Sequence, residues 1–355
     1  MSILRDQLYS DKKMAPIREY SCNAYDANVE NGKRDVPIKV TLPTTLFPEF
    51  KIRDYGKGLI YEDMVNIFCS YGESTKRNSN DFIGQLGIGS KSGFAYGDNF
   101  LVTSFIDNKK ITYNCVLDQS GVGSLIHLTT EDSAEPSGLE VTIPIRQQDI
   151  VDFKNKSLSF FKFWEVYPEI VGTSAYDIEN SRKKGDVILS GDGWEIYAND
   201  GRNMRIAHVV MGNISYPINW DLIYDYSSRY NDPKLRPFYE FITNSNVLLR
   251  MKIGEIEMAP SREALQYTEH TVKSIRAKLD NVIKTMSSSI NQTISTAPNL
   301  WEARMLYGKI FGYLTALNNN TNMYRQLERC FTDIVWGPNK VKIENYAFTN
   351  LNRFD

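Results

Sequence analysis

The feature of this chain that most restricts its fold is a short polar stretch followed by two separated glycine boxes. The polar stretch is REYSCNAYDAN, residues 18–28. The first box runs from Asp54 to Gly58, and the second runs from Gly84 to Gly89. Glycine lets a backbone approach a ligand closely or adopt a positive φ. The pattern therefore predicts a nucleotide site assembled from three separate pieces of chain.

The polar stretch is predicted to be a helix that Gly32 ends. Offsets of four and seven residues place Glu19, Asn23 and Asp26 on one stripe of such a helix. Asn23 offers an amide oxygen of the kind that Mg²⁺ accepts, and Glu19 could orient or deprotonate an attacking water. Taken alone, the same stripe is typical of a solvated helix face.

The first glycine box follows a strand-like run over residues 50–53. A carboxylate at a strand end, such as Asp54, can accept a hydrogen bond from an exocyclic amino group like that of adenine. Gly56 and Gly58 would let the backbone approach that ligand. The alternative for this box is an ordinary turn, because Asp and Gly are common turn residues.

The second glycine box is neither of two commoner phosphate-binding motifs. Ser90 stands where a P-loop needs a lysine, and Lys91 comes one position late. Ser92 replaces the third glycine of a dinucleotide fingerprint. The remaining interpretation is a glycine-rich loop that leads into a short helix, whose free N–H groups hold phosphates. The expected nucleotide-binding residues here are Gly84, Gly87, Gly89, Ser90, Lys91 and Ser92.

In order and spacing, these motifs resemble the gyrase, heat-shock chaperone, histidine kinase and MutL superfamily of ATPases, which share the Bergerat fold. The resemblance implies ATP and Mg²⁺ as cofactors and an ATP lid over about residues 59–83. It implies an adenine contact for Asp54, a Mg²⁺ ligand in Asn23 and a general base in Glu19. The matching positions are Glu19, Asn23, Asp26, Ala27, Asp54, Gly56, Gly58, Gly84, Gly87 and Gly89.

The chain departs from that superfamily at Leu139. A threonine that helps to hold the nucleotide often follows a glycine near the end of the ATPase domain, and here Leu139 follows Gly138. Ser137 and Thr142 are the nearby hydroxyl residues that could substitute for it.

A second motif, GEIEMAPSREALQYTEH, occupies residues 254–270. It lies between a strand-like run over 247–258 and a helix that Ser261 could help to begin and that reaches Ile290. The motif resembles a middle-domain loop of the heat-shock chaperones, whose arginine and glutamine reach the γ-phosphate of ATP. The resemblance implies the same catalytic role for Arg262 and Gln266, and arginine suits it because its charged planar fork grips phosphate. The alternative for Arg262 is a surface arginine near a helix start.

Over about residues 15–290 the chain is similar to the bacteriophage rIIA-type lysis-inhibition proteins, through residues 79–105 and the run GEIEMAPSREALQ. This resemblance implies an ATP-driven conformational switch that affects the timing of host lysis. It implies a homodimer or an rIIB-type partner, in the host bacterial cytoplasm or peripherally at the inner membrane. Two alternatives remain: a non-catalytic interaction module that binds ATP, and a DNA-linked ATPase of the MutL or topoisomerase kind.

Composition limits the other function classes. The net charge is −2, and the longest basic run is residues 182–184, which argues against an extended nucleic-acid-binding face. Four scattered cysteines show neither metal-ligand spacing nor the density of a disulfide-rich protein, which fits a reducing compartment. No apolar run approaches the length of a membrane span.

The predicted class is α+β, in a chain of 355 residues that is long enough for two domains. We expect a two-layer α/β sandwich of the Bergerat type over residues 1–145, with strands at 100–106, 111–117 and 139–145. Asp107 and Asn108 would form the turn between the first two strands. A βα transducer-like middle domain is expected over 146–290, and a mostly helical segment over 291–355. The apolar face of that segment is expected to contain Trp301, Met305, Leu306 and Phe311.

Overall fold

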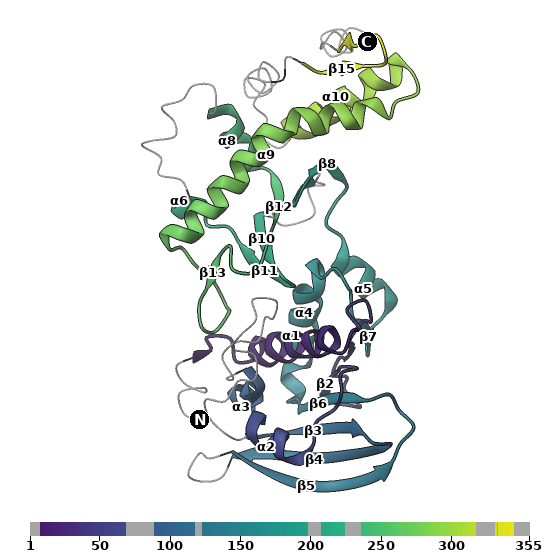
Figure 1. Cartoon of the computed structure of the whole chain (residues 1–355), viewed down its shortest axis with the longest axis vertical. Coiled ribbons are helices and arrows are strands. Elements are labelled where there is room, and N and C mark those ends of the chain that lie inside the picture. The colour runs from purple at the N-terminus through teal and green to yellow at the C-terminus, as the bar shows by residue number, and fades with distance from the viewer. Residues whose placement is uncertain are drawn as a thin grey trace. The chain divides into compact units, whose positions relative to one another are not determined.

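The computed structural model describes residues 8–68, 89–117, 123–197, 207–223, 236–316, 331 and 333–343. The chain forms two compact units, which are described separately. The first contains Met1–Lys183, Gly212–Ile214 and Met258–Ala264, and the second contains Lys184–Met211, Ser215–Glu257 and Leu265–Asp355. Both units combine helices with sheets, which confirms the predicted α+β class (Figure 1).

The first unit is built on a seven-stranded sheet with the order β5-β4-β3-β6-β2-β1-β7 (Figure 1). All the strand pairs with a described register are antiparallel except β1 with β7, which run parallel. The strands are β1 Lys39–Thr41, β2 Glu49–Arg53, β3 Asn99–Ile106, β4 Lys109–Leu117, β5 Gly123–Asp132, β6 Gly138–Pro144 and β7 Glu169–Val171.

Helices cover one face of this sheet, so the unit has the two predicted layers. Phe50 on β2 packs against Phe153, and Phe100 on β3 packs against Tyr20 and Phe94. These residues are buried because alternate positions of each strand point toward the helices. The helices of the unit are α1 Met14–Glu30, α2 Tyr61–Phe68, η2 Gly89–Lys91, α3 Gly93–Tyr96, η3 Gln147–Asp149, α4 Ile150–Phe160, η4 Phe161–Phe163 and α5 Ala175–Arg182.

The tight turn between β3 and β4 was correctly predicted. Asp107 and Asn108 have φ values of 50° and 55°, and Ile106 pairs directly with Lys109. A two-residue hairpin turn needs such left-handed conformations, which Asp and Asn tolerate better than most residues. This turn fixes the register of the long β3–β4 hairpin.

The first unit continues past the predicted boundary at residue 145. Strand β7 extends the sheet through its parallel pairing with β1, in which Lys39 lies opposite Glu169. Helix α4 packs on α1 and contributes Phe153 to the core. The three-residue strands β1 and β7 are too short to give a clear alternating pattern in the sequence. We therefore place the end of the first continuous segment of this unit at Lys183.

The second unit is built on a mixed five-stranded sheet with the order β11-β10-β12-β9-β8. The strand predicted over 247–258 is interrupted by a turn at Gly254, where φ is positive. The strands are β8 Val187–Gly191, β9 Trp194–Tyr197, β10 Ala207–Met211, β11 Ile214–Pro217 and β12 Asn246–Met251, with the short pair β13 Glu257–Met258 and β14 Leu265–Gln266. The helices are α6 Trp220–Ile223, α8 Arg236–Asn244, α9 Glu269–Ser295 and α10 Leu300–Ala316.

Two details of the predicted helices were wrong. Helix α9 does not begin near Ser261: Thr268 caps it, and its hydroxyl accepts a hydrogen bond from the Thr271 N–H at 3.3 Å. In α10, two of the residues expected on the apolar face are exposed, Trp301 at 72% and Met305 at 56%, and Leu306 is half-buried. The helix instead buries Ala303, Tyr307 and Ile310. A small hairpin, β15 Val335–Trp336 with β16 Val341–Lys342, follows α10.

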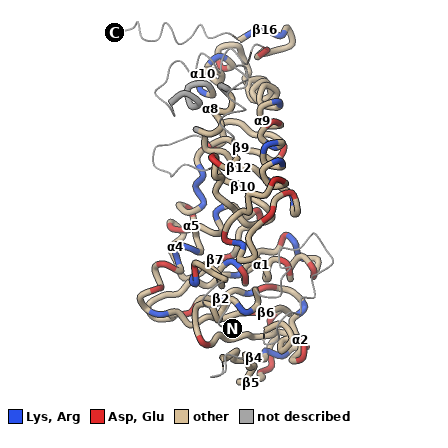
Figure 2. Tube along the Cα trace, turned by 90° about the vertical axis from the view of Figure 1, so that its left-hand side faces the viewer, with Lys and Arg blue, Asp and Glu red and all other residues tan. Residues whose placement is uncertain are grey.

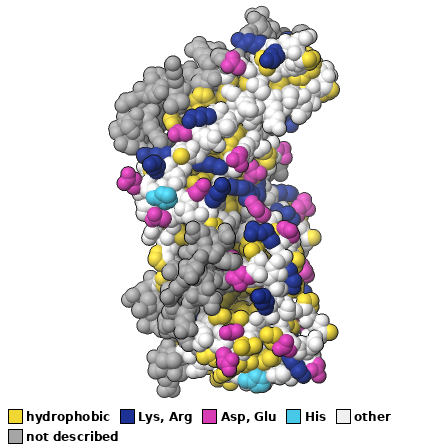
Figure 3. All heavy atoms as spheres, in the orientation of Figure 1, with side chains coloured by type: hydrophobic (Ala, Val, Ile, Leu, Met, Phe, Trp, Pro, Cys, Tyr) yellow, Lys and Arg dark blue, Asp and Glu magenta, His cyan; other side chains and the backbone are white. Residues whose placement is uncertain are grey.

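Acidic and basic residues are interspersed along the described chain (Figure 2) and on the face seen in Figure 3. Within the part of the chain that the structure describes, no helix has both the length and the apolar character needed to cross a membrane.

Candidate nucleotide-binding site

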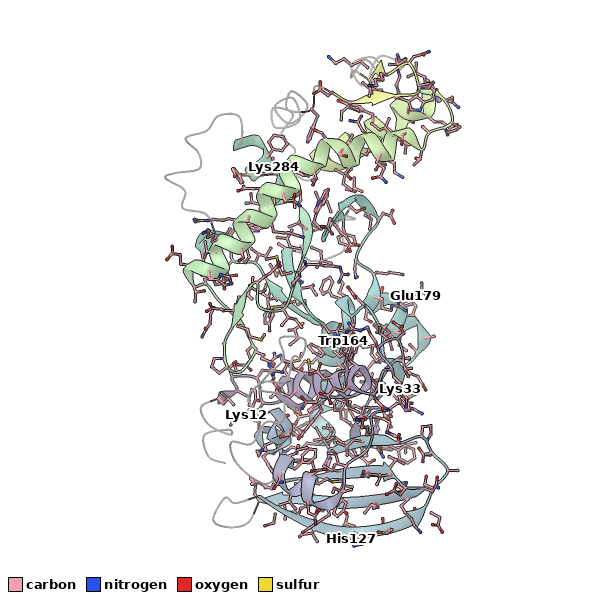
Figure 4. The ribbon with its side chains drawn as sticks, in the orientation of Figure 1. Lys12, Lys33, His127, Trp164, Glu179 and Lys284 are labelled. Atoms are coloured by element: carbon pink, nitrogen blue, oxygen red, sulfur yellow. The ribbon has the colours of Figure 1, made fainter. Side chains whose placement is uncertain are left out.

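Helix α1 provides the first piece of the candidate site, and Lys12 and Lys33 mark its two ends in Figure 4. The predicted helix is confirmed: it spans Met14–Glu30, and Gly32 follows with a φ of 71°. Glu19 is only 3% exposed and Asp26 only 2%, while Asn23 is half-buried. The alternative of a solvated helix face is therefore excluded.

Asp54 sits at the end of β2 and is held by two backbone segments. Its Oδ1 accepts hydrogen bonds from the N–H groups of Gly56, at 2.8 Å, and Leu139, at 3.0 Å. The Asp54 N–H in turn donates to the Leu139 carbonyl at 2.9 Å. These bonds fix the orientation of the Asp54 carboxylate at the end of the strand.

The first glycine box packs directly on α1 and on β3. A Cβ added at Gly56 would lie 3.1 Å from the Cβ of Ala27, so the box meets α1 through two small residues. Gly58 has a φ of 78°, and a Cβ there would lie 2.6 Å from the Phe105 carbonyl oxygen. A larger residue at either position would push the box away from its neighbours.

Sequence reasoning missed the residues that fasten this box to the end of α1. The buried Asn28 accepts the Tyr55 N–H at 2.6 Å and donates to the Val36 carbonyl at 2.9 Å. Lys33 Nζ donates to the Tyr55 carbonyl at 2.8 Å. Nothing in the sequence pattern could have identified them, because their partners are backbone groups of another segment.

Leu139 contacts Asp54 through its backbone N–H and carbonyl groups and not through its side chain. Of the two hydroxyl residues considered as substitutes for a threonine, Ser137 donates to the Gly56 carbonyl at 2.9 Å. Thr142 is buried within β6, opposite Lys51. Ser137 is therefore the hydroxyl that touches the glycine box.

The structure describes the second box from Gly89 onward. Outside the described residues lie Gly84, Gly87 and residues 69–83 of the expected lid. Gly89 opens η2, and the short helix α3 follows, as predicted. A Cβ added at Gly89 would collide with Glu19 Oε2. The second box thus packs closely against the carboxylate of the first piece.

The three residues after Gly89 are buried. Ser90 Oγ and Lys91 Nζ both donate to the Ile67 carbonyl, at 2.6 Å and 2.8 Å, near the end of α2. Tyr20, another residue that the sequence did not single out, donates its hydroxyl to the Ser90 carbonyl and accepts the Gly93 N–H, each at 2.9 Å. The η2–α3 turn is thus tied to α1 and to the end of α2.

Arg262 forms a buried ion pair with Glu19. Its Nη1 lies 3.2 Å from Glu19 Oε2, with side-chain exposures of 6% and 4%. Arg262 has a φ of 55°, and its loop, Met258–Ala264, belongs to the first unit. The alternative of a surface arginine is excluded. Gln266 is exposed, in β14, and belongs to the second unit.

Burial dominates the electrostatics around Glu19. It raises the pKa of the Glu19 carboxyl, and the positive charges of Arg262 and Arg18 oppose that rise. Burial also raises the pKa of the nearby Tyr9 hydroxyl, and the negative charge of Glu19 adds to that effect. A carboxyl with a raised pKa is a stronger base than one in water, as general-base chemistry requires.

The residues present fit a nucleotide carried with Mg²⁺. A Cβ at Gly56, Gly58 or Gly89 would meet neighbouring protein atoms, so these glycines let the two boxes pack closely against α1 and β3, and Asp54 is fixed at a strand end. Among the described residues, no three His, Cys, Asp or Glu side chains form a metal-binding cluster. Mg²⁺ that binds with a nucleotide takes most of its ligands from water and phosphate, so the half-buried Asn23 is the ligand offered here.

Comparisons with known proteins add little to this site. No protein-family model matches the chain, and no curated protein matches it. Among solved structures, the chain is similar to the ATPase region of Saccharomyces cerevisiae topoisomerase II bound to ICRF-187 (dexrazoxane). The sequence identity is 12% and the TM-score is 0.49, over 77% of this chain and 85% of that chain. The function must therefore be argued from the site residues.

Proposed function

We propose that the protein binds ATP with Mg²⁺ in a Bergerat-type site and hydrolyses it slowly. The observation that supports this proposal best is the meeting of three distant segments at one carboxylate. Gly89 packs on Glu19, Arg262 pairs with it, and both glycine boxes contact α1. A solvated surface carboxylate would need none of these neighbours.

Each motif residue then has a role in this proposal. Asp54 accepts a hydrogen bond from the adenine amino group, and the two glycine boxes let the backbone approach the nucleotide. Asn23 holds Mg²⁺, which when bound neutralises phosphate charge. Glu19 is the general base, and Arg262 binds the γ-phosphate with support from Gln266.

At the physiological level, we propose an rIIA-type conformational switch. ATP and ADP would stabilise different states, because only ATP offers Arg262 a γ-phosphate, and this difference would control dimerisation or the binding of an rIIB-type partner. The protein would act in the host bacterial cytoplasm or at the inner membrane and affect the timing of host lysis. The similarity of residues 79–105 and of the Arg262 loop to that family supports this proposal.

Glu19→Gln tests the catalytic assignment directly. Glutamine preserves the size of the side chain and can still accept a hydrogen bond from Arg262, so the fold and ATP binding should persist. Turnover should fall to background, because an amide cannot take a proton from water. Thermal shift with ATP, ADP and a non-hydrolysable analogue measures binding, and phosphate release measures turnover. If millimolar ATP leaves the melting temperature of the wild-type protein unchanged, the site does not bind ATP. If Glu19→Gln turns over ATP at the wild-type rate, Glu19 is not the general base.

The alternative is a non-catalytic module that binds ATP as a structural ligand. Leu139 favours it, since this position contributes only its backbone N–H and carbonyl to Asp54 where the superfamily often has a threonine. The alternative predicts an ATP-dependent rise in melting temperature with no turnover by the wild-type protein. A DNA-linked ATPase would instead bind DNA tightly at physiological salt, with the steep salt dependence of phosphate contacts.

A further inference from the structure

Glu263, the residue after Arg262, binds the segment that precedes α1. Its Oε2 accepts hydrogen bonds from the N–H and the hydroxyl of Ser10, at 3.0 Å and 2.9 Å. Its Oε1 accepts the N–H of Asp11 at 3.0 Å. One carboxylate thus receives three hydrogen bonds from two adjacent residues. Burial alone would raise the pKa of Glu263, but these hydrogen bonds lower it.

The segment that Glu263 binds is itself firmly anchored. Asp11 Oδ1 accepts the N–H groups of Lys13, at 3.2 Å, and Met14, at 3.0 Å, where α1 begins. Asp11 Oδ2 lies 2.5 Å from Lys156 Nζ on α4. Ser10 and Asp11 therefore form a fixed point that is joined to the same helix that bears Glu19.

Arg262 is in a conformation that needs support. Its φ of 55° lies in the left-handed region, which is unfavourable for a residue with a side chain. On one side of it, Arg18 Nη1 donates to the Ser261 carbonyl at 3.2 Å. On the other side, Glu263 binds Ser10 and Asp11. Contacts on both sides of the strained residue thus fasten the loop to α1 and to the segment before it.

We propose that Glu263 is a positioning residue, which holds the Arg262 guanidinium at Glu19 by fastening the loop to Ser10 and Asp11. This inference rests on the proposed ATPase function. Glu263 contacts neither the glycine boxes nor Asp54 in the described residues, so it should affect the step that uses Arg262 and not the affinity for the nucleotide.

Glu263→Gln is the variant that tests the proposal. Glutamine has the same size, but one carboxylate oxygen is replaced by an NH₂ group that faces N–H donors. At least one hydrogen bond to a charged acceptor is lost, which should slow turnover roughly tenfold or more with little change in ATP affinity. Glu257→Gln is the matched control, because Glu257 is an exposed glutamate at the base of the same loop. It should leave turnover unchanged.

A double-mutant cycle distinguishes positioning from a general structural role. If Glu263 acts through Arg262, Glu263→Gln should slow the wild-type protein but have no further effect in an Arg262→Ala background. Independent losses that multiply in the double variant would overturn the proposal.

Hydrogen exchange without nucleotide provides a readout that does not depend on turnover. Peptides covering residues 8–14 and 259–264 should exchange faster in Glu263→Gln than in the wild type, and at unchanged rates in Glu257→Gln. Unchanged exchange in Glu263→Gln would overturn the proposal whatever the ATPase result. A wild-type protein without ATPase activity, but with the expected exchange difference, would overturn the proposed function and leave the positioning contact supported.

Discussion

Replacing Arg262 with methionine should destabilise the region around α1, and the loss should be larger at high pH than at low pH. Methionine fills a similar apolar volume but leaves the Glu19 carboxylate buried without its partner. At 3.2 Å and an effective dielectric constant near 20, the lost attraction is about 5 kcal/mol. Breaking a buried ion pair by removing one partner typically costs about 3–5 kcal/mol. We therefore expect a loss of about 3 kcal/mol or more when Glu19 is ionised.

The pH dependence follows from the pKa of Glu19. Burial raises this pKa, Arg262 and Arg18 oppose the rise, and removal of Arg262 should raise it further. A carboxyl with a raised pKa in the folded state favours folding below its unfolded pKa, and that contribution is lost as the pH rises through the folded value. The variant should thus lose more stability than the wild type as the pH rises. The other titratable groups near Glu19 include Arg18, the Tyr9 hydroxyl and the Cys22 thiol.

Hydrogen exchange of peptides from α1 in increasing urea, at pH 5.5 and pH 8, would measure the local free energy of unfolding. The rates must be corrected for the pH dependence of chemical exchange. The control is Arg262→Met in a Glu19→Gln background, where no charge is left unpaired and most of the loss should disappear. Equal losses at both pH values, and equal losses in both backgrounds, would refute the view that the ion pair is what Arg262 contributes.

Three further predictions concern other residues of the site. Asp54→Asn should fold normally, because the amide oxygen can still accept hydrogen bonds from the two backbone N–H groups. ATP should no longer raise the melting temperature of this variant, and a preserved rise would contradict the adenine contact. Gly89→Ala should be destabilised by about 1–3 kcal/mol in urea unfolding, because its Cβ collides with Glu19, and a neutral effect would show that the loop can move away. The Cys22 thiol is buried, and burial raises its pKa. It should therefore resist alkylation in the folded protein, which mass spectrometry can follow. Rapid labelling would indicate that α1 opens readily.

The features that sequence reasoning predicted correctly depend on short-range patterns. The helix from Met14 to Glu30 and the turn at Asp107 and Asn108 each follow from residues close together in the chain. The buried pair of Glu19 with Arg262 does not. The role of Arg262 came only from a family resemblance, because no local pattern relates a loop to a helix so distant in the sequence.

Other features could not be read from residue types. Asn28, Tyr20 and Glu263 bind backbone groups, and a backbone amide leaves no mark in the sequence of the partner segment. The face of α10 was mispredicted for a different reason. That helix carries apolar residues on more than one side, so its periodicity could not decide between the stripe with Trp301 and the stripe with Tyr307.

The hydrogen bonds of the loop around Arg262 restrict the length of this loop more than its amino-acid composition. The Ala259 N–H donates to the Ala264 carbonyl and the Arg262 N–H donates to the Ala259 carbonyl, at 2.9 Å and 2.7 Å, so the loop is closed at a fixed size. Within it, each of three consecutive residues binds a different place on α1 or on the segment before it. Inserting or deleting one residue would shift all three out of register at once. We therefore expect natural variants to tolerate substitution in this loop far more readily than any change in its number of residues.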